Sequence, residues 1–338
     1  MIKKITVITC IFVSCHSFAQ QNFEQLLLSG IEDTKTFARS YISPGAESLM
    51  YSINSGWFKT AATHKFLGFD ISLIGATHFV EDSDQSFDMN VNDFQNIRFP
   101  DGSTSKKIAT VFGDNNPNET VIVTLTENGF SEDVEILLPD GVASENIDVL
   151  PAAFLQAELG IFKGTDLKVR YVPDFETEDV ETGLFGIGIQ HELTSWLPLQ
   201  RLLPVNVAVL GAYTHLNSEF DFTGRSALDG QNQKLELDVD TWLFQLFAST
   251  KLPIINFYGG VGYISGESDF DLKGTYEIQS NILSQPRVLT DPFSVSNSVS
   301  GARATVGANL KIAFFEMNAE YHFQEYNALS VGIHFGIR

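Results

Sequence analysis

The mature part of this sequence has no cysteine. Cys10 and Cys15 both lie in a segment where Lys3 and Lys4 precede the apolar run Ile5 to Val13, and Ser17-Phe18-Ala19 follows. This order is typical of an export signal, so we predict a signal peptide over residues 1–19. The mature chain can then form no disulfide, thiolate metal site or cysteine nucleophile, and its stability must come from pairing and packing.

Positive charge is also scarce. The chain has 21 Lys and Arg against 42 Asp and Glu, for a formal net charge of −21. This balance argues against nucleic acid as a partner, because binding phosphates requires clustered cations. The acidic balance suits an external surface.

Long apolar runs are missing after the signal. No stretch reaches the ~18 continuous apolar residues of a membrane-spanning helix. If the chain crosses a membrane, only a closed barrel can do so, because every backbone group in lipid must be paired within the protein. The alternative is a secreted soluble β protein.

Two-residue alternation dominates what is present. From Gly301 onward, Val306 and Leu310 belong to an apolar face, whereas Arg303 and Thr305 belong to a polar one. The pattern recurs in ten segments, beginning with Lys65 to Val80. In a transmembrane barrel the apolar face meets lipid and the polar face lines the lumen. In a soluble sandwich the apolar face meets a second sheet.

The connections between these segments favour the barrel. Long, acidic connections follow the odd-numbered segments and short turns follow the even-numbered ones. We therefore predict an all-β fold, a closed antiparallel transmembrane β-barrel of 10–14 strands over residues 63–338. It contains an acidic insertion at 81–150, where a hairpin around Asn128-Gly129 could raise the strand count, and a long polar loop at 270–300.

The region before the barrel predicts a short plug helix within residues 20–62. Phe23 to Tyr41 has helical spacing and Pro44-Gly45 is expected to stop it; packing of this helix on a soluble sheet is the alternative. Trp57 is interpreted as an anchor near the membrane interface. Near Thr241 the apolar residues change face, which predicts a bulge.

The expected lumen face carries charged and imidazole side chains that could form a permeation path, or could instead pair across strands. These candidates are Asp70, His78, Glu158, Lys168, Arg170, Glu192, Arg303, Lys311, Glu316, Glu320, His322 and His334. A barrel of this size is narrow, so a plug would gate it.

No catalytic signature is present. The histidines are scattered, and the sequence has no G-x-S-x-G, no H-E-x-x-H and no phosphate-cradling glycine loop. We expect no enzyme, no metal and no cofactor. The acidic residues 81–93 lack the glycine and distal glutamate of a calcium loop, which favours a solvated loop.

Several strings resemble a group of outer-membrane β-barrel proteins of unknown function from Bacteroidota. They are Phe23-Glu24-Gln25-Leu26-Leu27, Asn54-Ser55-Gly56-Trp57-Phe58, Lys65-Phe66-Leu67-Gly68-Phe69-Asp70 and Lys163-Gly164-Thr165-Asp166-Leu167-Lys168-Val169-Arg170-Tyr171. The resemblance covers most of the mature chain and implies the fold and the location. More distantly, a plug before a barrel looks like the long-chain fatty acid transporters, although their Asn-Pro-Ala motif is absent.

The sequence thus predicts a monomeric protein of the bacterial outer membrane, in contact with outer-membrane lipid and lipopolysaccharide. The favoured role is passive or gated passage of a small molecule, with a hydrophobic ligand as one candidate. The alternative is a structural or surface-interaction barrel that uses its long acidic loops.

Overall fold

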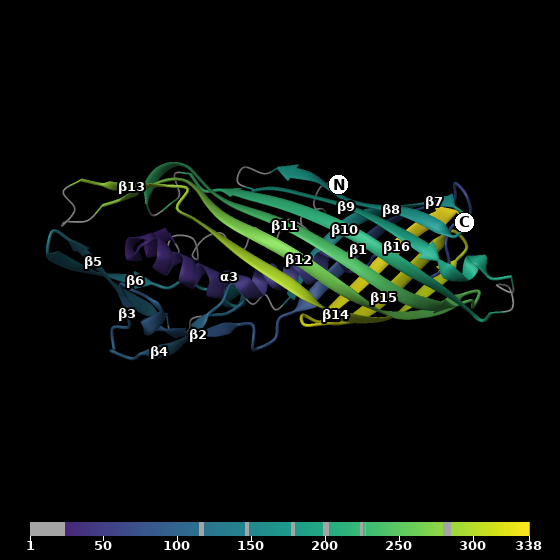
Figure 1. Ribbon diagram of the computed structural model, residues 1–338, viewed down its shortest axis with the longest axis horizontal. Helices are drawn as coiled ribbons and strands as arrows, with labels where there is room; N and C mark the ends of the chain where they lie inside the picture. The colour runs from purple at the N-terminus through teal and green to yellow at the C-terminus, as the bar shows by residue number, and fades with distance from the viewer. Residues whose placement is uncertain are drawn as a thin grey trace.

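Ten strands close into an antiparallel barrel in the computed structural model (Figure 1). The structure describes residues 24–114, 118–145, 149–176, 180–198, 203–223, 226, 228–279 and 285–337, so the expected signal peptide lies outside them. The barrel strands are β1 (Phe69–Phe79), β7 (Val149–Phe162), β8 (Thr165–Glu176), β9 (Val180–Glu192), β10 (Val205–Asp221), β11 (Asp229–Thr250), β12 (Ile255–Ile278), β14 (Phe293–Ile312), β15 (Phe315–Phe323) and β16 (Ala328–Ile337).

The sheet closes because the first and last barrel strands pair. Phe69 of β1 lies opposite Ile337 of β16, and β1 also pairs with β7 across the whole acidic insertion. Every barrel strand therefore has two hydrogen-bonded neighbours, which leaves no free edge. The predicted closed antiparallel barrel is confirmed at ten strands.

The two faces of the barrel separate as the alternation predicted. The outward face is an apolar belt in which Ile71, Phe244 and Val261 are each more than half exposed. The inward neighbours Ser72 and Gln245 are buried. An exposed belt of this size is the surface that a hydrocarbon layer covers.

The strands extend unequally beyond this belt. β11, β12 and β14 run for 22, 24 and 20 residues, whereas β15 and β16 have 9 and 10. The predicted polar loop at 270–300 was therefore largely wrong: β12 continues to Ile278, β13 (Arg287–Thr290) pairs with its end, and β14 begins at Phe293. We call this tall end of the barrel the cap end and the opposite end the turn end.

The bulge predicted near Thr241 was also wrong. Pairing of β10 with β11 runs without a shift from Val205 opposite Thr250 to Asp221 opposite Lys234. Val239 and Leu243 both point inward, while Trp242 points outward. The apolar residues change face because β11 leaves the belt there, and its inward side then packs on other protein elements.

The described part of the acidic insertion, residues 81–114 and 118–145, folds into a small β unit at the cap end. We call residues 81–148 the cap. It contains β2 (Ser86–Asn90), β3 (Ile97–Arg98), β4 (Ser105–Ala109), β5 (Thr120–Glu127), β6 (Phe130–Leu137) and the 3-10 turns η3 (Val91–Asp93) and η4 (Val142–Glu145). The predicted hairpin is confirmed as β5–β6, and Asn128 and Gly129 both have positive φ, as a type I′ turn requires. This hairpin stays outside the barrel, so it adds no barrel strand.

One long helix runs from the cap end into the barrel (Figure 1). After η2 (Leu26–Ser29), α3 spans Ile31–Ile53, so the prediction that Pro44-Gly45 ends the helix was wrong. Its turns after Pro44 bury Met50 and Ile53 against barrel strands, and this burial outweighs the lost hydrogen bond. No helix among the described residues has the length and apolar character needed to cross a membrane.

An apolar core lies at the cap end. Phe37 and Tyr41 of α3 pack in it together with cap residues such as Val121. The tall strands complete this core with Leu272 and Tyr276. The first half of α3 is thus an integral part of the cap, while the second half lies in the barrel.

A matched pair of substitutions tests the outward belt. We expect Phe244→Arg to reduce the free energy of unfolding in lipid vesicles by about 2–4 kcal/mol, the cost of arginine near the bilayer midplane. Phe130→Arg, at the tip of the cap hairpin, should change it little, although Phe130 is even more exposed. Equal effects in a urea titration would contradict the assignment of the belt to lipid.

Candidate functional site in the barrel lumen

Two buried guanidinium groups hold the C-terminal end of α3. Arg170 Nη1 donates to the carbonyl of Ile53 at 2.6 Å, and Arg303 Nη1 donates to that of Asn54 at 2.9 Å. The last carbonyls of a helix have no partner within the helix and carry partial negative charge. Two cations on opposite walls of the lumen therefore supply the hydrogen bonds that this helix end lacks.

Arg170 is itself fixed on several sides. Its guanidinium lies 4.1 Å from the ring centroid of Trp57 and 4.0 Å from that of Phe154. Gln156 Oε1 accepts hydrogen bonds from its Nε and Nη2 at 3.3 and 2.9 Å. The side chain is completely buried. Stacking and hydrogen bonds together compensate for the desolvation of the charge.

Trp57 lies inside the barrel, so its prediction as a membrane-interface anchor was wrong. The side chain is 1% exposed and packs against β9, where Gly186 and Gly188 leave room for the indole. A Cβ at Gly188 would come within 3.0 Å of the ring. The chain reaches this place because it continues through the lumen after α3 instead of turning outward to the membrane.

The segment from Asn54 to His64, which we call the lumen segment, is bound along its length by barrel side chains. Gly56 N donates to Glu320 Oε1 at 2.8 Å, and Lys168 Nζ donates to the carbonyl of Trp57 at 2.8 Å. Further along, Gln190 Nε2 donates to the carbonyl of Thr60, and Ala61 N donates to Ser249 Oγ. Side chains thus replace the secondary structure that this backbone lacks.

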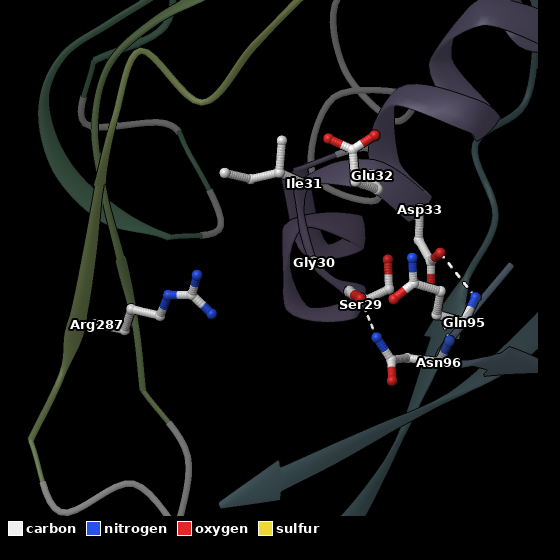
Figure 2. A pocket seen from close by; sticks show the side chains of 8 residues that line it. All are labelled: Ser29, Gly30, Ile31, Glu32, Asp33, Gln95, Asn96 and Arg287. Atoms are coloured by element: carbon white, nitrogen blue, oxygen red, sulfur yellow. Dashed lines mark hydrogen bonds between the residues drawn. The ribbon is translucent and has the colours of Figure 1, made fainter.

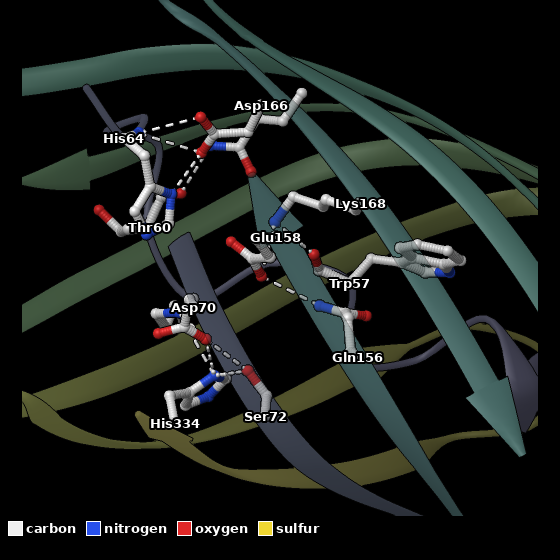
Figure 3. Close-up of polar contacts among 12 residues, drawn as sticks. Trp57, Thr60, His64, Asp70, Ser72, Gln156, Glu158, Asp166, Lys168 and His334 are labelled. Atoms are coloured by element: carbon white, nitrogen blue, oxygen red, sulfur yellow. Dashed lines mark hydrogen bonds and ion pairs between the residues drawn. The ribbon is translucent and has the colours of Figure 1, made fainter. Parts of the chain in front are cut away.

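Ion pairs cluster toward the turn end (Figure 3). Lys59 Nζ lies 3.1 Å from Asp70 Oδ1, and Lys168 Nζ lies 3.0 Å from Glu158 Oε1. His334 Nδ1 is 3.5 Å from the same Asp70 oxygen. All five side chains are buried. Each charge therefore has an opposite charge or imidazole at contact distance, as a low-dielectric interior requires.

His64 ends the lumen segment beside β8. Its Nδ1 lies 2.9 Å from Asp166 Oδ2, and its backbone N donates to the same carboxylate at 3.0 and 3.1 Å. Donor atoms of His64, Glu158 and Asp166 all lie within 4.8 Å of one another, and all three residues are buried. An imidazole and two carboxylates at this separation could hold a metal ion.

A second polar cluster surrounds Arg303 near the helix end. Arg303 Nε donates to His322 Nδ1 at 3.2 Å, and His322 Nε2 lies 3.2 Å from Glu320 Oε1. Ser330 Oγ donates to the same Glu320 oxygen at 2.8 Å. This series of hydrogen bonds connects β14, β15 and β16 to the lumen segment, because Glu320 also accepts a hydrogen bond from the backbone N of Gly56.

The structure places the predicted lumen residues on the inward face, and eleven of the twelve are buried. The exception is Lys311, whose side chain is 29% exposed and lies 3.1 Å from Glu316. His78 lies apart from the others at the cap end, where its Nδ1 faces the carbonyl of Asn327. Of the remaining residues, Lys168 pairs with Glu158, and His322 pairs with Glu320. Glu192 instead contacts Thr63 and Thr194, and Glu316 contacts Asn309.

Sequence reasoning missed Lys59, His64 and Asp166. Asp166 was assigned to a turn, although it is in phase with Lys168 and Arg170 on β8, and that phase would have placed it inward. Lys59 and His64 belong to the lumen segment, where no period exists that could show which way a side chain points.

A small cavity lies at the other end of α3 (Figure 2). Its volume is about 150 Å³, and it is lined by Ser29, Gly30, Ile31, Glu32, Asp33, Gln95, Asn96 and Arg287. The Asp33 carboxylate accepts hydrogen bonds from the backbone N of Gln95 and of Asn96, both at 2.8 Å. These bonds attach the first turn of the helix to the cap.

The fold and the lumen define a class: transmembrane β-barrels with an N-terminal helix inserted in the barrel. Within this class, the chain belongs to the family of unknown function (DUF6588), whose model matches residues 1–337. No curated protein matches the sequence. The predicted resemblance to a group of barrel proteins of unknown function agrees with this family. The resemblance to Bacteroidota proteins and to fatty acid transporters stays a prediction.

Several solved structures are similar in part. Ail, the attachment invasion locus protein of Yersinia pestis, is 10% identical over 80% of this chain and 97% of its own, with a TM-score of 0.24. The translocator domain of autotransporter NalP from Neisseria meningitidis is 10% identical over 81% and 90%, with a TM-score of 0.28. The ferric-catecholate import receptor Fiu of E. coli K12 is 8% identical over 77% and 55%, with a TM-score of 0.30.

The buried ion pair of Lys168 can be tested against an exposed one. We expect Lys168→Met to lower the free energy of unfolding by about 3–5 kcal/mol, because it leaves the buried Glu158 carboxylate without its cation. Lys35→Met removes an exposed pair with Glu32 and should cost about 0–1 kcal/mol. Adding Glu158→Leu to Lys168→Met should recover part of the loss, and no recovery would contradict the pairing.

Proposed function

We propose that this protein is a bacterial outer-membrane β-barrel with a filled lumen, whose barrel anchors the cap for contact with a partner outside the cell. The observation that carries the proposal is that α3 is fixed at both ends. Its first half packs in the apolar core of the cap, and its last carbonyls bind Arg170 and Arg303 in the lumen. The role is structural and interactive, and no catalysis is invoked.

Location and orientation follow from physical arguments. The apolar belt suits a bilayer, and barrels of the bacterial outer membrane have short turns in the periplasm and longer connections outside. The turn end, with connections such as Lys163-Gly164, would then face the periplasm, and the cap would face the exterior. Export by residues 1–19 is part of this proposal.

The same contacts argue against passage of a small hydrophobic molecule. Among the described residues, the lumen is filled by a segment that is hydrogen-bonded to charged and polar side chains. Passage would require this segment to leave, and buried Arg170 and Arg303 would then lose their carbonyl partners. Loss of a partner by a buried charge is costly.

The charge of the cap indicates the chemistry of a partner. Residues 81–148 contain 15 Asp and Glu against three Lys and Arg, so this unit carries −12 of the net charge of −21. Asp82, Asp88 and Asp93 are exposed on it. Hydrogen bonds from Ser103 and the nearby Lys106 ammonium lower the pKa of Asp101 to about 2, so that carboxyl stays ionised even in acid. A basic partner surface would match this field.

Conductance in planar bilayers tests whether the lumen is filled. We expect the wild-type barrel to show no stable open channel, and the variant Arg170→Met/Arg303→Met to show open events, because the helix end loses both donors. Lys35→Met should behave as wild type. A wild-type protein that conducts continuously would overturn the proposal, and heat-modifiable migration in SDS gels verifies that each variant is folded.

Binding of a basic peptide tests the role of the cap. A lysine-rich peptide should bind the detergent-solubilised protein, and its affinity should fall as salt rises. Asp82→Asn/Asp88→Asn/Asp93→Asn should weaken binding several-fold. Neutralising three exposed acids on β10, β11 and β12, namely Asp221, Asp229 and Glu267, should weaken it less. Equal weakening by both sets would show that only overall charge matters and would contradict a cap-specific surface.

A further inference from the structure

Three buried side chains from three different elements converge near the turn end (Figure 3). His64 comes from the lumen segment, Glu158 from β7 and Asp166 from β8. Their donor atoms lie within 4.8 Å of one another. An imidazole nitrogen and two carboxylates are ligand types that Zn²⁺ binds.

One nitrogen of His64 lacks a partner. Nδ1 faces Asp166, but Nε2 is buried and has no hydrogen bond within the part of the chain that the structure describes. The side chain is only 2% exposed, so bulk solvent does not reach this nitrogen. A buried imidazole nitrogen without a hydrogen-bond partner is energetically unfavourable. A metal ion bound to Nε2 would give this nitrogen a partner, and a metal ion bound to Nδ1 would fix the proton on Nε2.

Buried carboxylates outnumber buried Lys and Arg in the described part of the lumen. Among the described residues, six carboxylates are buried in the lumen, against four Lys and Arg and the partly exposed Lys311. The carboxylates are Asp70, Glu158, Asp166, Glu192, Glu316 and Glu320, and the buried cations are Lys59, Lys168, Arg170 and Arg303. A lumen with more buried carboxylates than Lys and Arg side chains electrostatically favours a bound cation.

The hydrogen bonds of Glu158 leave room for an additional ligand. Gln156 Nε2 and Lys168 Nζ both contact Oε1, at 3.0 Å each. Lys168 also donates to the carbonyl of Trp57, so its ammonium keeps a partner if the carboxylate turns toward a metal ion. The nearby lysine therefore does not have to leave for the carboxylate to bind.

We propose that His64, Glu158 and Asp166 bind a divalent transition-metal ion of the Zn²⁺ type. Two ligands on one tetrahedral Zn²⁺ lie ~3.3 Å apart when each bond is ~2.0 Å, so atoms within 4.8 Å need only small side-chain rotations. Ca²⁺ is a poorer fit because it takes six to eight oxygens. The ion would join the end of the lumen segment to β7 and β8, a role that is independent of any partner of the cap.

Metal titration of the purified protein tests the site. After removal of metal with EDTA, isothermal titration in millimolar Ca²⁺, which occupies exposed carboxylates, should show one Zn²⁺ per chain. His64→Gln should weaken this binding at least tenfold. His191→Gln is the matched control, because His191 contacts Thr165 and Trp196 at the same end of the barrel, and it should bind Zn²⁺ as wild type does.

Cobalt provides a readout that needs no variant. Co²⁺ bound to the wild-type protein should show the intense visible absorption of a tetrahedral site, and Zn²⁺ should displace it. Absence of any Zn²⁺ site in wild type, or equal binding by His64→Gln, would overturn the proposal. The first result would show that the cluster holds no ion, and the second would show an adventitious ion only.

Discussion

The end of a helix inside a barrel presents carbonyl groups that must find donors away from bulk water. In this protein the donors are the guanidinium groups of Arg170 and Arg303, which reach the carbonyls of Ile53 and Asn54 from different walls. Much of the lumen serves this contact. Gln156 and two aromatic rings fix Arg170, His322 and Glu320 accompany Arg303, and glycines on β9 make room for the Trp57 indole.

The helix joins two structures that would otherwise be separate. Its first half contributes Phe37 and Tyr41 to the cap core, and the Asp33 carboxylate attaches its first turn to the cap backbone. Its second half carries Met50 and Ile53 into the barrel. A displacement of the helix would therefore break contacts at both ends at once. This coupling is the basis for proposing an anchored cap and not a removable plug.

The sequence predicted the features that depend on a two-residue period. Arg303 and Val306 were assigned to opposite faces correctly, because a residue in a strand has only two directions to point. Lys59, His64 and Trp57 could not be placed this way, since the lumen segment has no period. Pro44 suggested a helix end because its local cost is visible in sequence, whereas the burial of Met50 that outweighs it depends on tertiary contacts. At Thr241, the change of face reflected the limit of the membrane belt and not a bulge.

Hydrogen–deuterium exchange of the folded protein in lipid nanodiscs tests the central claim most directly. The backbone amides of Gly56, Ala61 and His64 donate to Glu320, Ser249 and Asp166, respectively. If the lumen segment is fixed as described, these amides should exchange as slowly as those of the barrel strands. Exchange at the rate of an unstructured loop would show that the segment leaves the lumen readily, and it would contradict the account of a barrel filled by its own chain.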